Sequence, residues 1–244
     1  MKRLLFNLKE HNMKSEMIVA HMDDAGTVAG VTYKVQGELT PMLMLDLAPD
    51  ASVYFEHHVV LTRQPKVKLE VMPLDGAWKR LVAGLPLIMV CAKGPGAISF
   101  SREHPGHVFA IHLKKGQQLK CPEHTLLAAT SNIKYDFEWV KGFFRNQVLG
   151  GNGMFVDTFT AMADEDAVWL HGHGNVIEYT LDAGEELDVE PGAWIYGDPS
   201  VQMTTVYQKL SMGFLSGRNF WFNRFTGPGR VGVQTGFWEP TAAS

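Results

Sequence analysis

The sequence predicts an all-β protein built from three internal repeats, with short helices in its loops. The first observation is a step that occurs three times, in which an apolar residue is followed three positions later by a turn residue and three later again by another apolar residue. The step reads LAPDASV at 47–53, LKKGQQL at 113–119 and LDAGEEL at 181–187. The second observation is alternation of apolar residues over short segments bounded by Gly, Pro, Asn and Asp, which is typical of strands.

The repeat period is near 67 residues. Three apolar segments precede a turn at this spacing, namely LIMVCAK (87–93), MFVDTFT (154–160) and FWFNRFT (220–226). Self-similarity at a fixed period indicates a repeat architecture. We therefore expect a single pseudo-threefold β domain over 1–244, with repeats at roughly 41–104, 105–172 and 173–237. A linear stack of the three units is the alternative.

Each element follows from the same patterns. Strands are predicted at VKLEV (67–71), IKYDF (133–137) and VQMTTVY (201–207), after opening strands in MIVAHM (17–22) and GVTYKVQG (30–37). Helices of one to three turns are predicted only at 78–82 and 138–149. The glycine-proline-glycine segments at 94–96 and 227–229 are predicted turns, and DED at 164–166 takes their place in the middle repeat.

Composition limits the function classes. The 244 residues are 45% hydrophobic and 20% charged, and the net charge of −4 with a pI near 6.2 argues against a nucleic-acid-binding face. Only Cys91 and Cys121 are present, which fits a reducing environment and gives no thiolate zinc motif. With no apolar run of membrane-spanning length and no signal-peptide pattern, we expect a cytoplasmic protein.

The motif HGHGNVIE (171–178) is the strongest candidate for a metal site. The spacing of His171, His173 and Glu178 is similar to the way a cupin barrel presents a metal. Aligned with the preceding repeat, however, HGHGN falls on EHPGH (103–107), and both segments resemble hairpin turns. The competing interpretation is therefore that these are solvated turn histidines. We predict no catalytic, cofactor-binding or metal-binding residue.

Other polar and aromatic residues have structural interpretations. Adjacent His57 and His58 are expected on a strand, where they would point to opposite faces. The carboxylates of ADEDA (163–167) and AGEELDVEPG (183–192) are expected to form a solvated acidic face. The tryptophans are expected to fill the core, namely Trp169, Trp194 and Trp221.

Three equivalent loops combine large apolar residues with Lys or Arg. They are GAWKRLVAG (76–84), VKGFFRNQVLG (140–150) and QKLSMGFLSGR (208–218). Such loops suit an oligomer interface, a protein partner or a membrane surface. The alternative is that they cap the open ends of the core.

The repeated unit, with its GPG turn, its L-x-x-G-x-x-L step and the strand carrying Pro199, Ser200 and Val201, resembles the altered inheritance of mitochondria protein 24 family, also called the mitochondrial biogenesis family. GMFVDTFT (153–160), EELDVEPGAWIYGDPSV (185–201) and FTGPGRVGVQT (225–235) carry the resemblance. It implies a double-stranded β-helix similar to the tryptophan RNA-binding attenuation protein, a tendency to form homo-oligomers, and no assigned catalytic residues.

Taken together, the sequence predicts a non-enzymatic oligomeric scaffold or adaptor protein without a cofactor. The loops at 76–84, 140–150 and 208–218 are its expected contact surface. Two alternatives stay open. One is a cupin-like metal-dependent enzyme that uses His171, His173 and Glu178, and the other is a module that binds a small ligand.

Overall fold

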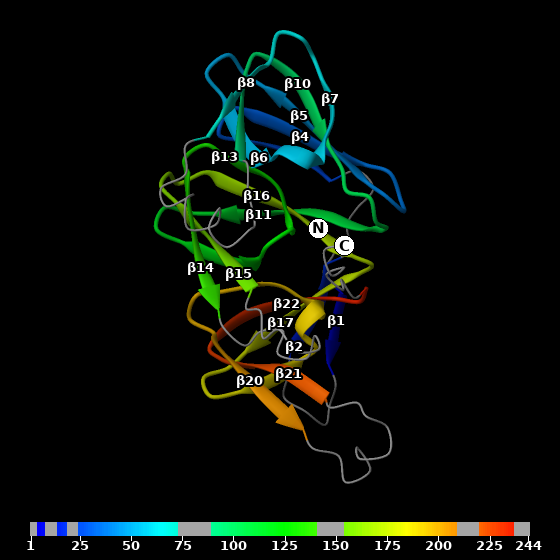
Figure 1. The fold of residues 1–244 in the computed structure, drawn as a ribbon, viewed down its shortest axis with the longest axis vertical. Coiled ribbons are helices and arrows are strands. Elements are labelled where there is room, and N and C mark those ends of the chain that lie inside the picture. Colours follow the sequence, from blue (N-terminus) through cyan, green and yellow to red (C-terminus); the bar gives the residue numbers. More distant parts are fainter. Residues whose placement is uncertain are drawn as a thin grey trace.

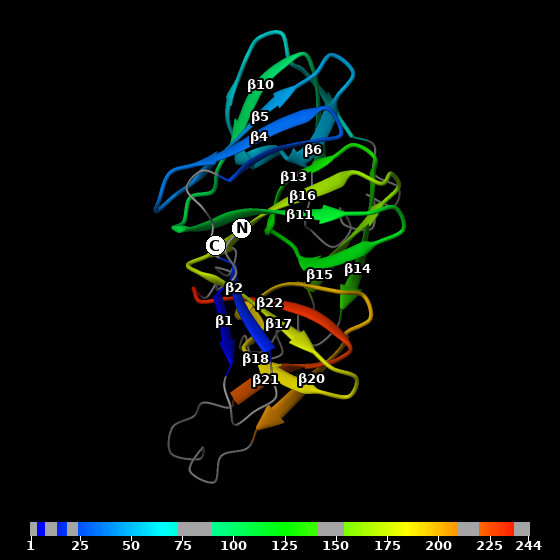
Figure 2. The same cartoon turned by 180° about the vertical axis from the view of Figure 1, so that it is seen from behind.

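The structure is a computed structural model that describes residues 4–7, 14–18, 24–72, 89–140, 154–208 and 220–236, and in these ranges it is all-β (Figures 1 and 2). The predicted fold class is thereby confirmed. The helical elements of these ranges are two short 3₁₀ turns, η1 (His57–Val59) and η2 (Pro191–Ala193). Neither is long and apolar enough to cross a membrane.

Six strands occur in the same order in three consecutive segments, which we call unit 1, unit 2 and unit 3. Unit 1 comprises β5 (Met42–Leu47), β6 (Ser52–Glu56), β7 (Val60–Arg63), β8 (Lys68–Val71), β9 (Met89–Lys93) and β10 (Gly96–Phe100). Unit 2 comprises β11 (Gly106–Leu113), β12 (Gln118–Pro122), β13 (Leu126–Thr130), β14 (Ile133–Val140), β15 (Met154–Ala161) and β16 (Asp166–His173). Unit 3 comprises β17 (Val176–Leu181), β18 (Glu186–Val189), β19 (Trp194–Gly197), β20 (Gln202–Gln208), β21 (Phe220–Thr226) and β22 (Gly229–Gln234).

Strand pairing is the same in every unit. The first, sixth and third strands form one antiparallel sheet, as in β5-β10-β7, and the second, fifth and fourth form the other, as in β6-β9-β8. The corresponding triplets are β11-β16-β13 and β12-β15-β14 in unit 2, and β17-β22-β19 and β18-β21-β20 in unit 3. We infer that the units are the three repeats predicted from the sequence, although their limits as repeats of one domain stay a prediction.

Register fixes the equivalence of single residues between units. Arg63 lies opposite Ile98, Ala129 opposite Val168, and Gly197 opposite Val231. In each unit the pairing of the third strand with the sixth shifts register two residues earlier, at Leu61, Leu127 and Ile195. A bulge in the same place three times indicates that one backbone design is repeated, since bulges re-aim a strand locally.

The units are joined edge to edge. The third strand of unit 2, β13, pairs with the second strand of unit 1, β6, so that Ala129 lies opposite Tyr54. In the same way β19 of unit 3 pairs with β12 of unit 2, with Gly197 opposite Lys120. Each joint, which we call a seam, merges two three-stranded sheets into one continuous sheet.

The result is a linear stack, with unit 1 at one end, unit 2 in the middle and unit 3 at the other end (Figures 1 and 2). Four further strands complete the described fold. β3 (Ala25–Val28) and β4 (Val31–Gln36) extend the unit 1 sheet beyond β5. β1 (Leu4–Asn7) and β2 (Lys14–Ile18) extend the unit 3 sheet beyond β17. The likeness to a double-stranded β-helix stays a prediction.

The two GPG segments are the turns that the sequence predicts. Gly96 and Gly229 have φ values of +133° and +139°, which favour glycine. A Cβ atom at Gly94 would collide with the carbonyl oxygen of Ala48, and one at Gly227 with that of Asp182. Glycine is therefore required on both sides of the proline for the chain to pass close to the preceding turn.

The cores of the units continue across the seams. Leu127 on β13 of unit 2 belongs to the apolar cluster of unit 1, and Ile195 on β19 of unit 3 belongs to that of unit 2. Both side chains are 0% exposed. β13 and β19 thus each insert a side chain into the core of the unit before them, so each seam is a continuation of the core.

The helices predicted from the sequence are not found in the described residues. Residues 138–140 belong to strand β14, and the rest of the predicted helix at 138–149, like the one at 78–82, lies outside the described residues. His57 and His58 lie in η1 and not on a strand, so the expected opposite orientation is wrong. Their rings lie 5.5 Å apart, centroid to centroid.

The seam predicts a contrast between equivalent leucines. Leu127→Ala removes a side chain buried in the neighbouring unit and should lower the free energy of unfolding by about 3 kcal/mol. The equivalent change Leu61→Ala on β7 affects a side chain that is 55% exposed and should cost less than about 1 kcal/mol. Urea denaturation of both variants measures the difference, and equal losses would contradict insertion across the seam.

Candidate functional site

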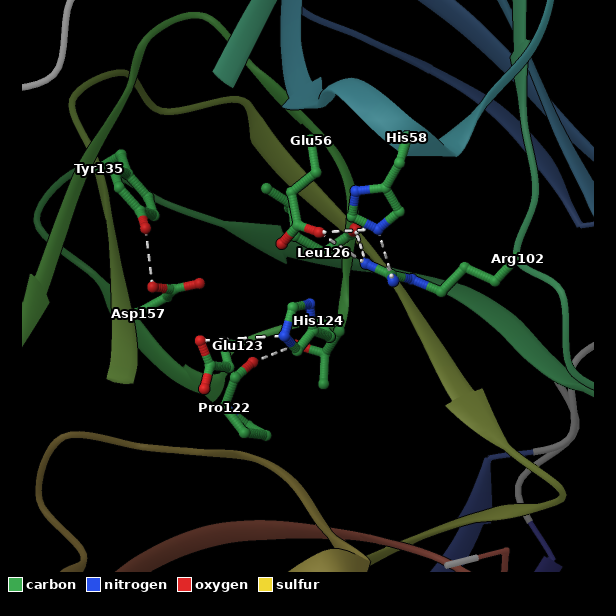
Figure 3. A network of polar contacts seen from close by, with 10 residues as sticks. Glu56, His58, Arg102, Pro122, Glu123, His124, Leu126, Tyr135 and Asp157 are labelled. Atoms are coloured by element: carbon green, nitrogen blue, oxygen red, sulfur yellow. Dashed lines mark hydrogen bonds and ion pairs between the residues drawn. The ribbon is translucent and has the colours of Figure 1, made fainter. Parts of the chain in front are cut away.

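A cluster of polar side chains lies at the seam between units 1 and 2 (Figure 3). Glu56 ends β6 with a side chain that is 1% exposed, and Arg102 reaches it from the segment that links β10 to β11. The Arg102 Nη2 donates to Glu56 Oε2 at 3.1 Å and to the carbonyl oxygen of Leu126, on β13, at 2.7 Å. One guanidinium therefore ties the last residue of β6 to the strand that pairs with it.

Two histidines complete this cluster. His58 Nε2 lies 3.3 Å from Glu56 Oε2 and 3.3 Å from Arg102 Nη1. Burial lowers the pKa of His58, and the nearby positive charge of Arg102 lowers it further, whereas Glu56 acts in the opposite direction. His124 follows β12, and its ring centroid lies 6.4 Å from that of His58.

The cluster has the composition of a metal site but already contains a cation. Glu56, His58 and His124 have ligand atoms within 4.8 Å of one another. Arg102, however, hydrogen-bonds the carboxylate and lies within 3.3 Å of the imidazole nitrogen. Since Arg102 balances the buried carboxylate charge from within the ligand set, the arrangement acts best as a clamp between two units.

The histidines of HGHGNVIE lie near this cluster, at the end of β16, where the backbone N–H of His171 donates to the carbonyl oxygen of Thr125, the residue before Leu126. β16 continues through His173, pairing with Gly106, so the motif is strand up to that residue and turns only afterwards. His171 is 1% exposed. The expectation of a solvated turn is therefore wrong for His171, because the β11–β16 pairing extends two residues further than the glycines suggest.

His171 is held as a neutral imidazole. Its Nε2–H donates to the carbonyl oxygen of His104 at 3.1 Å, which leaves Nδ1 as a buried acceptor without a partner among the described residues. Burial lowers the pKa of His171 to about 3, and the positive charge of Arg102 adds to this. Burial, with His104 and Arg102 nearby, also lowers the pKa of His173.

Glu178 takes part in a separate network. It lies on β17 and accepts from the Tyr196 hydroxyl at 2.6 Å, while Arg230 approaches the same carboxylate oxygen at 3.6 Å. Arg230 in turn forms a two-pronged pair with Asp198. In the described part of the chain, the set of ligand atoms close enough for a metal does not include His171, His173 or Glu178. The cupin-like interpretation thus lacks its geometry.

A surface pocket of about 350 Å³ opens at the seam between units 2 and 3. Its polar groups include Lys120 and Glu138, which form an ion pair of 2.7 Å, and Asp198. The remaining lining is mainly apolar and comprises Val156, Trp194, Gly197, Val201, Gln202, Met203 and Phe225. At the other seam, aromatic rings pack at the equivalent positions, with Tyr54 opposite Tyr135.

The remaining candidates have mixed outcomes. Trp169 and Trp194 are buried, as predicted, while the side chain of Trp221 lies outside the described residues. Asp164 and Glu165 are exposed, but Asp166 is buried and accepts from the Thr130 hydroxyl, so the predicted acidic face is wrong at that residue. The loops at 76–84, 140–150 and 208–218 lie outside the described residues except for Val140 and Gln208.

Sequence reasoning missed the Arg102 clamp. Glu56 and Arg102 are 46 positions apart and belong to no motif, so spacing alone gives no signal. The repeat alignment does place His58 and His124 at equivalent positions, 66 residues apart, where each follows its unit's second strand. This equivalence is the sequence signal that could have indicated a polar cluster at the seam.

Comparison with known proteins gives a family match and a similar solved structure. A family model described as mitochondrial biogenesis AIM24 matches residues 33–236. The X-ray crystal structure of a protein from Streptococcus pyogenes is similar to the chain, with a TM-score of 0.66 and 19% identity, covering 85% of this chain and 94% of that one. At this identity the likeness shows the fold alone. A search of curated proteins finds no match.

The clamp predicts a large stability effect. Arg102→Ala leaves Glu56 buried beside an uncharged imidazole and should lower the free energy of unfolding by about 3 kcal/mol at neutral pH. Arg63→Ala, which removes a more exposed arginine of the same unit, is the control and should cost less. Chemical denaturation measures both, and a loss no larger than that of the control would contradict the clamp.

His171 predicts a pH dependence. In the folded protein the pKa of His171 is about 3, below the ordinary 6.5 of the unfolded chain. Its contribution to the free energy of unfolding is therefore fully present above pH 6.5. The contribution is lost as the pH falls below 6.5, because His171 of the unfolded chain then binds a proton that the folded protein does not bind. Between pH 7 and pH 5 this residue should cost about 2 kcal/mol.

His171→Gln keeps a side-chain N–H donor and should reduce this pH dependence, whereas His57→Gln, at an exposed position, should preserve it. Urea denaturation at pH 7 and pH 5 gives the slopes. Identical slopes for the wild type and His171→Gln would contradict the assignment.

Proposed function

The chain belongs to the mitochondrial biogenesis AIM24 family, and we propose that it acts as a non-enzymatic oligomeric scaffold or adaptor. The observation that carries this proposal is that buried apolar and polar side chains join the units to one another at the seams. Leu127, Ile195 and the Arg102–Glu56 pair all connect one unit to the next. A chain whose buried groups hold repeats in line is suited to presenting surfaces at fixed spacing.

The three apolar-basic loops at 76–84, 140–150 and 208–218 are the proposed surface for a protein partner or a membrane. Each contains Lys or Arg beside large apolar residues, a combination that binds either partner class. Because the loops occupy equivalent places in the three units, they would repeat at regular intervals along the stack. Nucleic acid is disfavoured by the net charge of −4.

A small-ligand module is the second candidate, favoured by the pocket between units 2 and 3. Its mainly apolar lining with a few charged groups is the usual composition of a small-molecule site. The charged pairs Lys120–Glu138 and Arg230–Asp198 already satisfy one another, so a ligand would gain chiefly from contact with Trp194, Val201 and Phe225.

Native mass spectrometry of the untagged protein separates these functions. The scaffold proposal expects a defined multimer without added mass. One transition-metal mass per chain would instead favour the cupin-like enzyme, and its loss in His171→Ala would place the metal at the motif. A retained organic mass would favour the small-ligand module, and a monomer at every concentration would count against the oligomeric scaffold.

The loop variants Phe143→Asp and Phe214→Asp test the proposed contact surface. Each places a charge in an apolar-basic loop and should weaken assembly or partner binding, while far-ultraviolet circular dichroism remains that of a folded β protein. Asp164→Arg, at an exposed turn outside these loops, is the control. Unchanged assembly and binding in both loop variants would contradict a role for the loops.

A further inference from the structure

Within the described part of the chain, two sheets end in strands without the neighbour that equivalent strands have at the seams. At both seams, the third strand of one unit pairs with the second strand of the unit before it. The third strand of unit 1, β7, is an edge strand of its sheet, and so is the second strand of unit 3, β18. In the described residues neither outer edge is paired with another strand. The two lie in units at opposite ends of the stack (Figures 1 and 2).

Register predicts how these two edges would match. The seams align Ala129 with Tyr54 and Gly197 with Lys120. The equivalent of Ala129 and Gly197 on β7 is Arg63, and the equivalent of Tyr54 and Lys120 on β18 is Asp188. A third joint of the same kind would place Arg63 opposite Asp188, a pair of opposite charge.

Burial also differs at the two free edges. Leu61 on β7 is equivalent to Leu127 and Ile195, which insert into the preceding unit and are 0% exposed, yet Leu61 is 55% exposed. On the other side, Leu187 of β18 is only partly buried, whereas its equivalents Val53 and Leu119 are 0% exposed. Both halves of a seam are therefore present, and among the described residues no strand covers them.

Charge favours contact between these two ends. The segment 60–68 around β7 contains Arg63, Lys66 and Lys68 and no acidic residue. The segment 185–190 around β18 contains four acidic residues and no basic one, and Arg224 is the neighbouring cation that pairs with Asp188. A basic edge and an acidic edge attract each other and repel their own kind, which favours a head-to-tail contact over a symmetric one.

We propose that β7 of one copy pairs with β18 of a second copy, with Arg63 opposite Asp188 and Leu61 inserted beside Leu187, so that copies join head to tail through a third seam. The two free sheets would then merge into one, as the sheets of adjacent units do within the chain. A head-to-tail contact closes into a ring or extends as a filament. This inference rests on the proposed oligomeric scaffold and assigns its self-association to strand edges, apart from the loops.

One variant blocks each edge. Leu61→Asp places a charge where β7 would insert, and Asp188→Arg opposes Arg63 with a like charge. Each should raise the dissociation constant for self-association by about tenfold or more. The matched controls are Met162→Asp, whose side chain is also 55% exposed, and Asp164→Arg, and both should assemble like the wild type. Sedimentation velocity over a concentration series gives the constants, and thermal unfolding verifies that each variant is folded.

Mixing the two blocked variants tests the direction of the contact. Leu61→Asp retains a free β18 edge, and Asp188→Arg retains a free β7 edge. Each alone should be largely monomeric, but a one-to-one mixture should give dimers and no larger species. Dimers in the mixture would support the head-to-tail seam.

The other outcomes overturn the inference in distinguishable ways. A wild type that assembles, with Leu61→Asp and Asp188→Arg assembling equally well, would place self-association elsewhere and leave the scaffold proposal standing. A wild type that is monomeric at every concentration would overturn both. A mixture that remains monomeric while each variant has lost assembly would rule out the head-to-tail pairing.

Discussion

The structure depends on one interaction, the pairing of the third strand of each unit with the second strand of the unit before it. Leu127 and Ile195 show why the joint is part of the core, since each is buried in its neighbour's apolar cluster. A single unit has too few strands to cover its own apolar faces, and stacking supplies the missing cover. The fold is thus a sequence of mutually dependent units whose apolar clusters continue across the two seams.

The seams also determine where the polar groups lie. Arg102 lies at the first seam, where it hydrogen-bonds both Glu56 and the carbonyl oxygen of Leu126. Burial lowers the pKa of both His58 and His171, and the charge of Arg102 lowers it further. The cation that holds the two units together therefore adds to burial in keeping the surrounding imidazoles neutral. The histidines, which make the sequence look like that of a metalloprotein, are therefore explained by their position around a clamp.

Much of the fold could be predicted from the sequence, because repeated turns leave a periodic trace. The strands predicted at 67–71, 133–137 and 201–207 correspond to the fourth strand of each unit, since Val67 and Val201 directly precede that strand and Ile133 begins it. The burial and the contacts of single side chains could not be predicted in this way. The turn predicted at His171 is wrong because Gly172 and Gly174 suggest a turn, whereas pairing with β11 continues through Gly172 to His173. The Glu56–Arg102 pair depends on contacts between distant segments, which no local pattern encodes.

The two ends of the stack differ from its middle in the residues at the positions that face a neighbouring unit. Terminal units of repeat proteins usually carry polar replacements at the positions that face a neighbour, because no neighbour covers them. Here the replacement is partial. Arg63 is charged where the equivalent residues are Ala129 and Gly197, and Asp188 is acidic where they are Tyr54 and Lys120. Leu61 and Leu187, however, remain apolar. Charges alone would suit a cap, and apolar residues alone would suit a permanent joint. Their combination, with opposite charge at the two ends, suits a joint that forms between copies and can be weakened by salt.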